Sequence, residues 1–310
     1  GNGTGSATTF FNGLTTNAGG TTEFSGNVVA LTQTFNDDIV LNGSMNMSGT
    51  TTNAGLSATF NGQVDATNST IQLGFVSTAI DGANWSNLAS LRFEGTDIGL
   101  QNTLQTTGDQ TYIATNPVHL DGDTILVGET LSIANGLDGQ TKNLVLNFAQ
   151  TTSLDGNFTN INNVISEGDV SLNGNLITLG DQTYQANASL AGNVILQGES
   201  LLFSNGVDGA SHSLGLDFSK STALNGTFEN IDFLTSGGDV SLNGTIRTIQ
   251  SQTYNANVSL SGNTTLAGSV LSVASGVDGG GKNLNLNFSS TTSLSGGFSN
   301  IGNLASEGNV

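Results

Sequence analysis

Cysteine is absent from this 310-residue sequence, and proline occurs once. The absence of cysteine excludes a disulfide scaffold and a thiolate metal site, and it leaves an extracellular location open. Basic residues are also scarce, with five Lys and Arg against 24 Asp and Glu and a formal net charge of −19. Such a chain has no basic patch with which to neutralise phosphates, so we expect no nucleic-acid partner.

Long apolar runs are missing as well. No segment approaches the roughly 18 apolar residues of a membrane-spanning helix, so we expect no membrane insertion. Charged residues make up 9% of the chain, while hydrophobic residues reach 35%. Because the hydrophobic residues recur at regular positions, a folded chain is expected and not a disordered one. The sequence does not begin with Met, and we expect a mature or excised piece whose targeting and anchoring parts lie elsewhere.

An internal repeat of about 70 residues dominates the sequence. Residues 136–205 recur at 206–275. The tripeptide Gln-Thr-Tyr at 182–184 returns at 252–254, and an earlier copy at 110–112 lies slightly further away. Repetition at a fixed period is typical of solenoid architectures, in which each unit buries its apolar face against its neighbours.

Within this repeat, a glycine that follows Asn, Asp or another small residue recurs at intervals of roughly 17 residues. Asn102 is the one exception in the extended series, and Asn is the residue that best replaces Gly at a positive φ. Phe, Leu, Ile or Val stands two positions before every member. We therefore predict structural bends lined up along one edge of the fold. The predicted bends in the regular part of the chain are Gly139, Gly156, Gly174, Gly192, Gly209, Gly226, Gly244, Gly262, Gly279 and Gly296.

Between the bends the sequence alternates with a period of two, as at 214–218 and 284–288, which predicts short half-buried strands. A unit of this size cannot bury its own apolar face, but stacked units close a continuous core. The prediction is an all-β fold, a parallel β-helix (β-solenoid) of about 17 coils of roughly 17–20 residues. A β-sandwich is the alternative, but it does not require one glycine series at nearly constant spacing.

The expected organisation is a single elongated β-solenoid over residues 1–310. Residues 1–100 are expected to form irregular coils, because the glycine spacing is uneven there. Residues 101–310 are expected to hold three copies of a four-coil super-repeat of roughly 70 residues.

The Gly-Asp-Gln-Thr-Tyr strings at 108–112 and 180–184, with Ser-Leu-x-Gly and Val-Asp-Gly bends, resemble repeats of large filamentous-haemagglutinin-like adhesins. The resemblance covers nearly the whole chain. It implies a right-handed parallel β-helix in a protein that bacteria secrete through two-partner or autotransporter routes. It also implies an extracellular or cell-surface location and a role in adhesion, aggregation or biofilm.

One constellation of acidic residues suggests a ligand. Asp121, Asp138 and Asp155 each precede a glycine of the series in three successive predicted coils. Stacked in register they would lie ~5 Å apart, and calcium would suit such a ladder of carboxylates. The alternative is that each Asp is a solvated residue that caps its own bend.

No catalytic constellation or cofactor motif is found, so we expect no enzyme. The two histidines, His119 and His212, are expected to lie about five coils apart. The leading hypothesis is a structural stalk of a secreted adhesin, in which other parts of the parent chain bind a host or cell-surface receptor or glycan. One alternative is a self-polymerising extracellular fibre subunit, with end-to-end or lateral self-association. A second alternative is a carbohydrate-binding or carbohydrate-cleaving β-helix of the tail-spike type.

Overall fold

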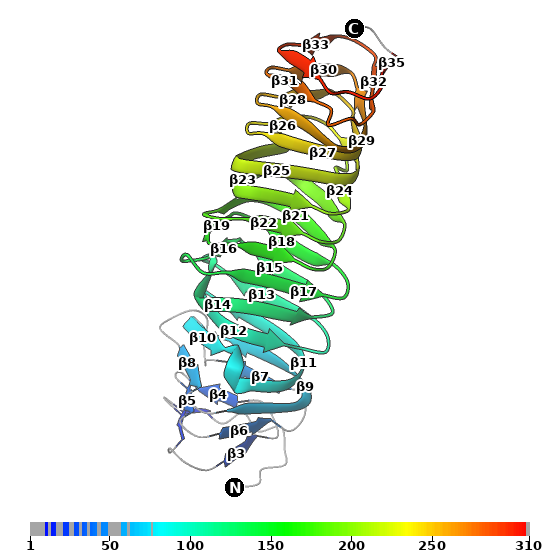
Figure 1. Ribbon diagram of the computed structural model, residues 1–310. Helices are drawn as coiled ribbons and strands as arrows, with labels where there is room; N and C mark the ends of the chain where they lie inside the picture. Colours follow the sequence, from blue (N-terminus) through cyan, green and yellow to red (C-terminus); the bar gives the residue numbers. More distant parts are fainter. Residues whose placement is uncertain are drawn as a thin grey trace. The chain divides into compact units, whose positions relative to one another are not determined.

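The computed structural model describes residues 63–75 and 77–307 continuously, together with short segments nearer the amino end (Figure 1). Those segments are 10–11, 14–16, 21–24, 28–30, 33–35, 38–41, 45–48 and 57–60. The chain divides into two compact units, residues 1–156 and 157–310. The described residues of both units are strands and turns, without an α-helix.

The first unit contains eighteen of the strands and one short 3-10 turn. They are β1 (Phe10–Phe11), β2 (Leu14–Thr15), β3 (Thr21–Phe24), β4 (Val28–Ala30), β5 (Gln33–Phe35), β6 (Asp38–Leu41), β7 (Met45–Ser48), β8 (Ser57–Phe60), β9 (Val64–Gly74), β10 (Ser77–Asp81), η1 (Gly82–Asn84), β11 (Trp85–Gly95), β12 (Asp97–Gln105), β13 (Gln110–Ala114), β14 (Val118–Gly128), β15 (Leu131–Ala134), β16 (Leu137–Asp138), β17 (Leu144–Phe148) and β18 (Thr152–Asp155).

The second unit contains the remaining strands, several of which bend within their length. They are β19 (Phe158–Ile161), β20 (Val164–Ser166), β21 (Val170–Thr178), β22 (Gln182–Tyr184), β23 (Ala188–Phe203), β24 (Gly206–Asp208), β25 (Leu214–Ile231), β26 (Leu234–Ser236), β27 (Val240–Thr248), β28 (Ser251–Tyr254), β29 (Val258–Gly268), β30 (Val270–Val273), β31 (Gly276–Asp278), β32 (Leu284–Phe288), β33 (Thr292–Leu294), β34 (Gly297–Ser299) and β35 (Leu304–Ser306).

The pairings in both units are parallel and join residues one turn apart, which confirms the predicted parallel β-solenoid. Over the described residues the fold has about 12 turns, so the predicted count of about 17 coils is not confirmed. The turns are longer than the glycine spacing suggested. In the second unit Val194 lies opposite Leu214, and a later turn runs from Leu271 to its partner Thr292. Because each turn uses more residues than expected, the chain forms fewer turns.

Each turn of the second unit contributes three short runs that pair separately with the next turn. The first part of β29 pairs with β31, its second part pairs with β32, and β30 pairs with β33. Side chains alternate along each run, so that Val258 and Leu260 are buried while Ser259 between them is exposed. The apolar stripe of each turn therefore faces inward and is covered by the stripes of its neighbours.

The super-repeat does not equal a whole number of turns. Leu196 lies opposite Leu216, which lies opposite Ser236; the same column continues through Tyr254 to Val273. Four turns therefore run from position 196 to position 273, which is a longer stretch than one copy of the repeat. The predicted four-coil super-repeat is wrong in this respect, because each copy falls short of four turns by about a third of a turn. Equivalent residues of successive copies in this unit thus lie on different sides of the solenoid.

The predicted glycine column is wrong for the same reason. Gly226 and Gly244 lie opposite each other, but Gly174 lies opposite Val194, and Gly244 is followed by Thr264 on its other side. The glycine series has a shorter period than the turns, so it drifts against them. The glycines therefore wind around the unit and do not mark one edge.

Eight of the ten predicted glycines still mark bends with a positive φ, in two different ways. Five of the ten predicted bends have a positive φ, namely Gly156, Gly174, Gly226, Gly244 and Gly296. At Gly139, Gly209 and Gly279 the positive φ values fall instead on the two following residues, such as Ala210 and Ser211 after Gly209. Asn102 has a φ of 61°, which confirms the prediction that it replaces glycine in a left-handed conformation.

The spacing of turns is uneven in the first part of the chain. Thr21 lies opposite Asp38, whereas Met45 lies opposite Ile71, so the second of these turns is much the longer. The parts of the expected irregular region at residues 1–100 that fall between these segments lie outside the described residues.

Candidate functional site

The three predicted calcium ligands are not stacked. Asp138 lies opposite His119, two positions before Asp121 on the preceding turn. Asp155 directly follows Leu154, which lies opposite Ile133, so it is not opposite Asp138. The expected ladder fails because it assumed turns as short as the glycine spacing, whereas the turns here are longer.

Asp138 instead acts within its own bend, since its Oδ1 accepts a hydrogen bond from the backbone N–H of Gln140 at 3.1 Å. This is the alternative that the sequence left open. Over the described ranges 63–75 and 77–307 and the shorter segments before them, no group of three or more His, Asp or Glu is placed to hold a metal ion. The structure thus removes the geometric support for calcium at these residues.

A different group of titratable side chains comes together at the same place. His119 on β14 lies between Asp97 on β12 and Asp121 on its own strand. Its Nδ1 is 3.4 Å from Oδ1 of Asp97, and its Nε2 is 3.3 Å from Oδ1 of Asp121. Sequence reasoning missed this group because positions 97 and 119 meet only once the length of the turn is known. The available signal was the acid two positions after the histidine.

Gly99 makes room for this group. It lies opposite His119 on the preceding turn. A Cβ atom at this glycine would lie 2.7 Å from Nε2 of His119 and 2.3 Å from Oδ2 of Asp121. The imidazole and the Asp121 carboxylate therefore occupy a slot that any other residue at position 99 would fill.

Many other surface acids are bound by Asn side chains one turn away. Oδ1 of Asp123 accepts hydrogen bonds from both the backbone N–H and the side-chain amide of Asn143, at 2.9 and 3.2 Å. These bonds, the backbone one first, lower the pKa of Asp123. Asp239 and Asn257 repeat the arrangement in the second unit. Neighbouring turns are thus joined by side chains as well as by the strand ladder.

A polar group is also buried in the core of each copy. Nε2 of Gln182 donates to the carbonyls of Leu176 and Gln197 at 3.1 and 2.9 Å, and its Oε1 accepts from the hydroxyl of Tyr184 at 3.1 Å. Gln182 and Tyr184 are both fully buried. We call this group the Gln-Tyr clamp. It recurs with Gln110 and Tyr112 in the first unit, and with Gln252 and Tyr254 in the second.

The clamp explains the Gln-Thr-Tyr motif. The amide joins carbonyls of two successive turns, and the tyrosine hydroxyl satisfies its oxygen. Burial raises the pKa of Tyr184 and of its two equivalents well above the usual range, so the hydroxyls stay protonated donors. The Tyr184 ring stacks on Phe203 at 4.7 Å. These three tyrosines therefore belong to the core and present no edge to a glycan.

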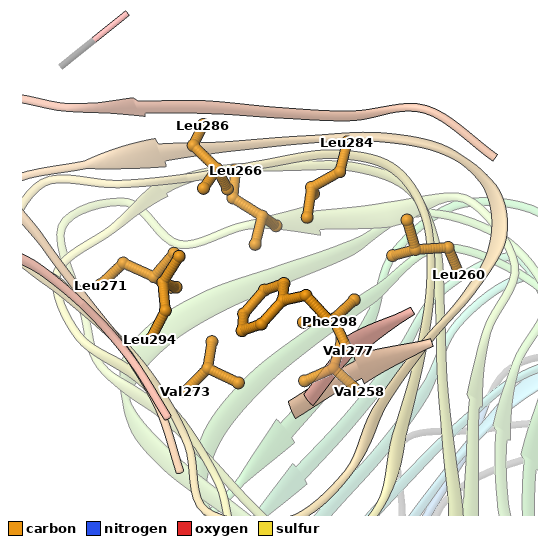
Figure 2. Close-up of a pocket in the computed structure, with 10 residues that line it drawn as sticks. All are labelled: Val258, Leu260, Leu266, Leu271, Val273, Val277, Leu284, Leu286, Leu294 and Phe298. Atoms are coloured by element: carbon orange, nitrogen blue, oxygen red, sulfur yellow. The ribbon is translucent and has the colours of Figure 1, made fainter. Parts of the chain in front are cut away.

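The second unit also has an apolar cavity, which Figure 2 shows from the side chains that line it. They are Val258, Leu260, Leu266, Leu271, Val273, Val277, Leu284, Leu286, Leu294 and Phe298. None of them carries a polar side chain, so the cavity offers no acid, base or nucleophile. It is a part of the core that the inward side chains do not completely fill.

The few basic side chains described here lie on the surface. Lys220 pairs with Glu199, and Arg92 pairs with Glu94, in each case with both partners substantially exposed. His212 belongs to the second unit, whereas His119 belongs to the first. The described residues therefore offer one group with acid-base character, at Asp97, His119 and Asp121.

Comparison with family models, curated proteins and solved structures found no match to this chain. The described residues include no helix long and apolar enough to cross a membrane.

Proposed function

We propose that this chain is a structural segment, a stalk or filament part, of a secreted bacterial cell-surface adhesin. In this role it extends the reach of binding parts elsewhere in the parent protein toward a host receptor, cell surface or glycan. The observation that carries the proposal is the parallel ladder of both units, in which residues of each turn pair with those of the next turn.

Two further features support a mechanical role. The Gln-Tyr clamp joins successive turns inside the core, and Asn-Asp pairs such as Asn257 and Asp239 join them at the surface. A solenoid gains stability from each contact between neighbouring turns, so bonds that span turns resist separation along the axis. The net charge of −19 disfavours lateral association of sheet surfaces. The resemblance of the repeats to filamentous-haemagglutinin-like adhesins supports the same role.

A reach assay tests the proposal. The chain is inserted between a surface anchor and a small binding domain on cells coated with a polymer layer, and binding to a ligand on beads is measured. The matched control is a flexible Gly/Ser linker of the same number of residues. Because a flexible linker has a mean span that grows only as the square root of its length, we expect the chain to support binding through thicker coats.

Equal binding by both inserts would contradict the stalk. Removing one copy, residues 158–227, is expected to shorten the reach by roughly 17 Å, since turns stack at about 4.8 Å. Growth of the isolated chain into fibres as its concentration rises would favour the polymerising subunit instead. Release of reducing sugar from a glycan panel would favour the tail-spike type of enzyme.

A further inference from the structure

The group formed by Asp97, His119 and Asp121 joins two successive turns of the first unit. His119 lies opposite Gly99, whose turn also carries Asp97. The contact from Nδ1 to Asp97 therefore crosses between turns, whereas the contact from Nε2 to Asp121 stays within β14. The side chain of His119 is 21% exposed and those of Asp97 and Asp121 are 46% and 37% exposed.

The geometry depends on the protonation state of the ring. A neutral imidazole has one N–H donor and one acceptor lone pair, whereas the imidazolium ion has two donors. Both ring nitrogens of His119 face carboxylate oxygens. Both contacts can therefore be hydrogen bonds only when the ring carries two protons, and loss of one proton leaves a lone pair facing a carboxylate.

We propose that His119 is a proton-operated latch between two turns of the first unit, closed when the ring is doubly protonated and weakened when it is neutral. This device is independent of the stalk function proposed above. It allows the surface between positions 97 and 121 to open more readily as the pH rises.

The charged groups named here around His119 are all negative. Asp97 faces the ring from β12, Asp121 from β14, and Asp138 lies opposite His119 on β16. Asp81 on β10 accepts hydrogen bonds from Ala83 and Asn102. All of these groups are carboxylates, so each one beside the ring can accept a hydrogen bond and none can donate one. The two contacts of the ring are therefore complete only when both of its nitrogens carry a proton.

Hydrogen exchange of the full chain tests the latch. Amide protection over residues 97–121 is compared between the wild type and His119→Gln at each pH, so that the intrinsic pH dependence of exchange cancels. Because the group is partly exposed, we expect a protection ratio of about two- to fivefold near pH 5.5. The ratio is expected to fall to about one near pH 8.

Two controls separate the latch from a general effect. The His212→Gln variant should leave exchange over residues 97–121 unchanged at every pH. The Gly99→Ala variant keeps the histidine but fills its slot, so it should lose the pH-dependent protection as His119→Gln does. A ratio that does not change with pH, or a Gly99→Ala variant that keeps the full pH dependence, would overturn the proposal.

A spectroscopic readout does not depend on any variant of His119. The chain has two histidines, so ¹⁵N spectra of the imidazoles are assigned with the His212→Gln variant. At low pH we expect protons on both nitrogens of His119, and slower proton exchange with water than for the ring of His212. Equal exchange for the two rings would also count against the latch.

Discussion

In the second unit the Gln-Tyr clamp of residues 176–197 can be compared directly with that of residues 246–267. Gln182 and Gln252 donate to equivalent pairs of carbonyls at 2.8 to 3.1 Å, and the two tyrosine hydroxyls donate at the same distance of 3.1 Å. The two copies lie on different sides of the solenoid, because one copy is shorter than four turns. The clamp is therefore a local device that works at any position around the axis.

The surfaces of the same two copies differ. The ion pair of Glu199 with Lys220 is replaced in the next copy by a contact between the hydroxyls of Ser269 and Ser290. The residues with positive φ after the Asp-Gly bend are Ala and Ser in one copy and two glycines in the other. The interior thus sets the repeat, while the surface varies within the limits of the backbone.

The largest expected effect comes from the clamp itself. Gln182→Leu leaves the buried hydroxyl of Tyr184 without an acceptor and removes donors from two carbonyls, and it should lower the free energy of unfolding by about 3 kcal/mol. Gln252→Leu should cost the same within about 0.5 kcal/mol, because the two clamps share the same carbonyl and tyrosine partners. Urea unfolding followed by circular dichroism measures both, and unequal losses would break the comparison of the two interiors.

Tyr184→Phe is the matched control for the clamp. It removes only the hydroxyl and should cost about 1 kcal/mol, since the glutamine keeps its two carbonyl partners. If Tyr184→Phe lowered the free energy of unfolding as much as Gln182→Leu, the stabilisation by the clamp would come mainly from the tyrosine hydroxyl.

The second expected effect concerns the bends that precede the Asp-Gly turns. Gly206 has a φ of 101°, and a Cβ there would lie 2.0 Å from the carbonyl oxygen of Thr227. Gly206→Ala should therefore lower the free energy of unfolding by about 2–3 kcal/mol. Gly276→Ala should behave alike, because its φ is 119° and its Cβ would lie 2.4 Å from the carbonyl oxygen of Gly297. Thermal unfolding of the two variants tests this, and tolerance of either substitution would contradict it.

A smaller effect is expected where the copies differ. Ser211 has a φ of 69°, and its equivalent Gly281 has a φ of 78° with no atom within 4 Å of an added Cβ. Gly281→Ser should therefore cost only about 1 kcal/mol, the strain of a left-handed residue. Ser211→Gly should stabilise by a similar or smaller amount, because glycine also loses more backbone entropy on folding. Denaturation midpoints that move in the same direction for the two variants would show that the turns are not equivalent.

The smallest expected effect is that of the surface ion pair. The hydrogen bond to Glu199, and then its charge, raise the pKa of Lys220 above the usual value. A raised lysine pKa means that the stabilisation is present below about pH 10.5 and is lost as the pH rises through the folded pKa. Lys220→Ser introduces the residue found at the equivalent position 290. It should remove this loss of stability at alkaline pH and change the stability little at neutral pH. Melting temperatures are measured between pH 8 and pH 12, with and without salt. If the melting temperature of the variant falls with rising pH as much as that of the wild type, Lys220 is excluded as the cause.

The sequence was sufficient to predict the parallel β-solenoid, because period-two alternation at 214–218 and 284–288 falls on strands β25 and β32. The length of the turn could not be predicted. Register shifts, such as that between Gly198 and Ser200, add residues to a turn without advancing the ladder, and nothing in a single sequence marks them.

The predictions about candidate sites failed because they assumed the wrong turn length. The predicted ladder of Asp121, Asp138 and Asp155 assumed a register that the structure does not have. The contact between Asp97 and His119 was missed because their separation along the chain is neither the glycine spacing nor a multiple of it. Short-range features were more secure, since the positive φ of Asn102 depends only on its own bend.

The mismatch between the repeat and the turn has a consequence for long arrays. Each further copy is rotated about the solenoid axis by about a third of a revolution relative to the copy before it. The same surface residues therefore return to one side only with every third copy. An array could be lengthened copy by copy without generating an unbroken stripe of like side chains along one side, and a continuous apolar patch of that kind would favour association between molecules.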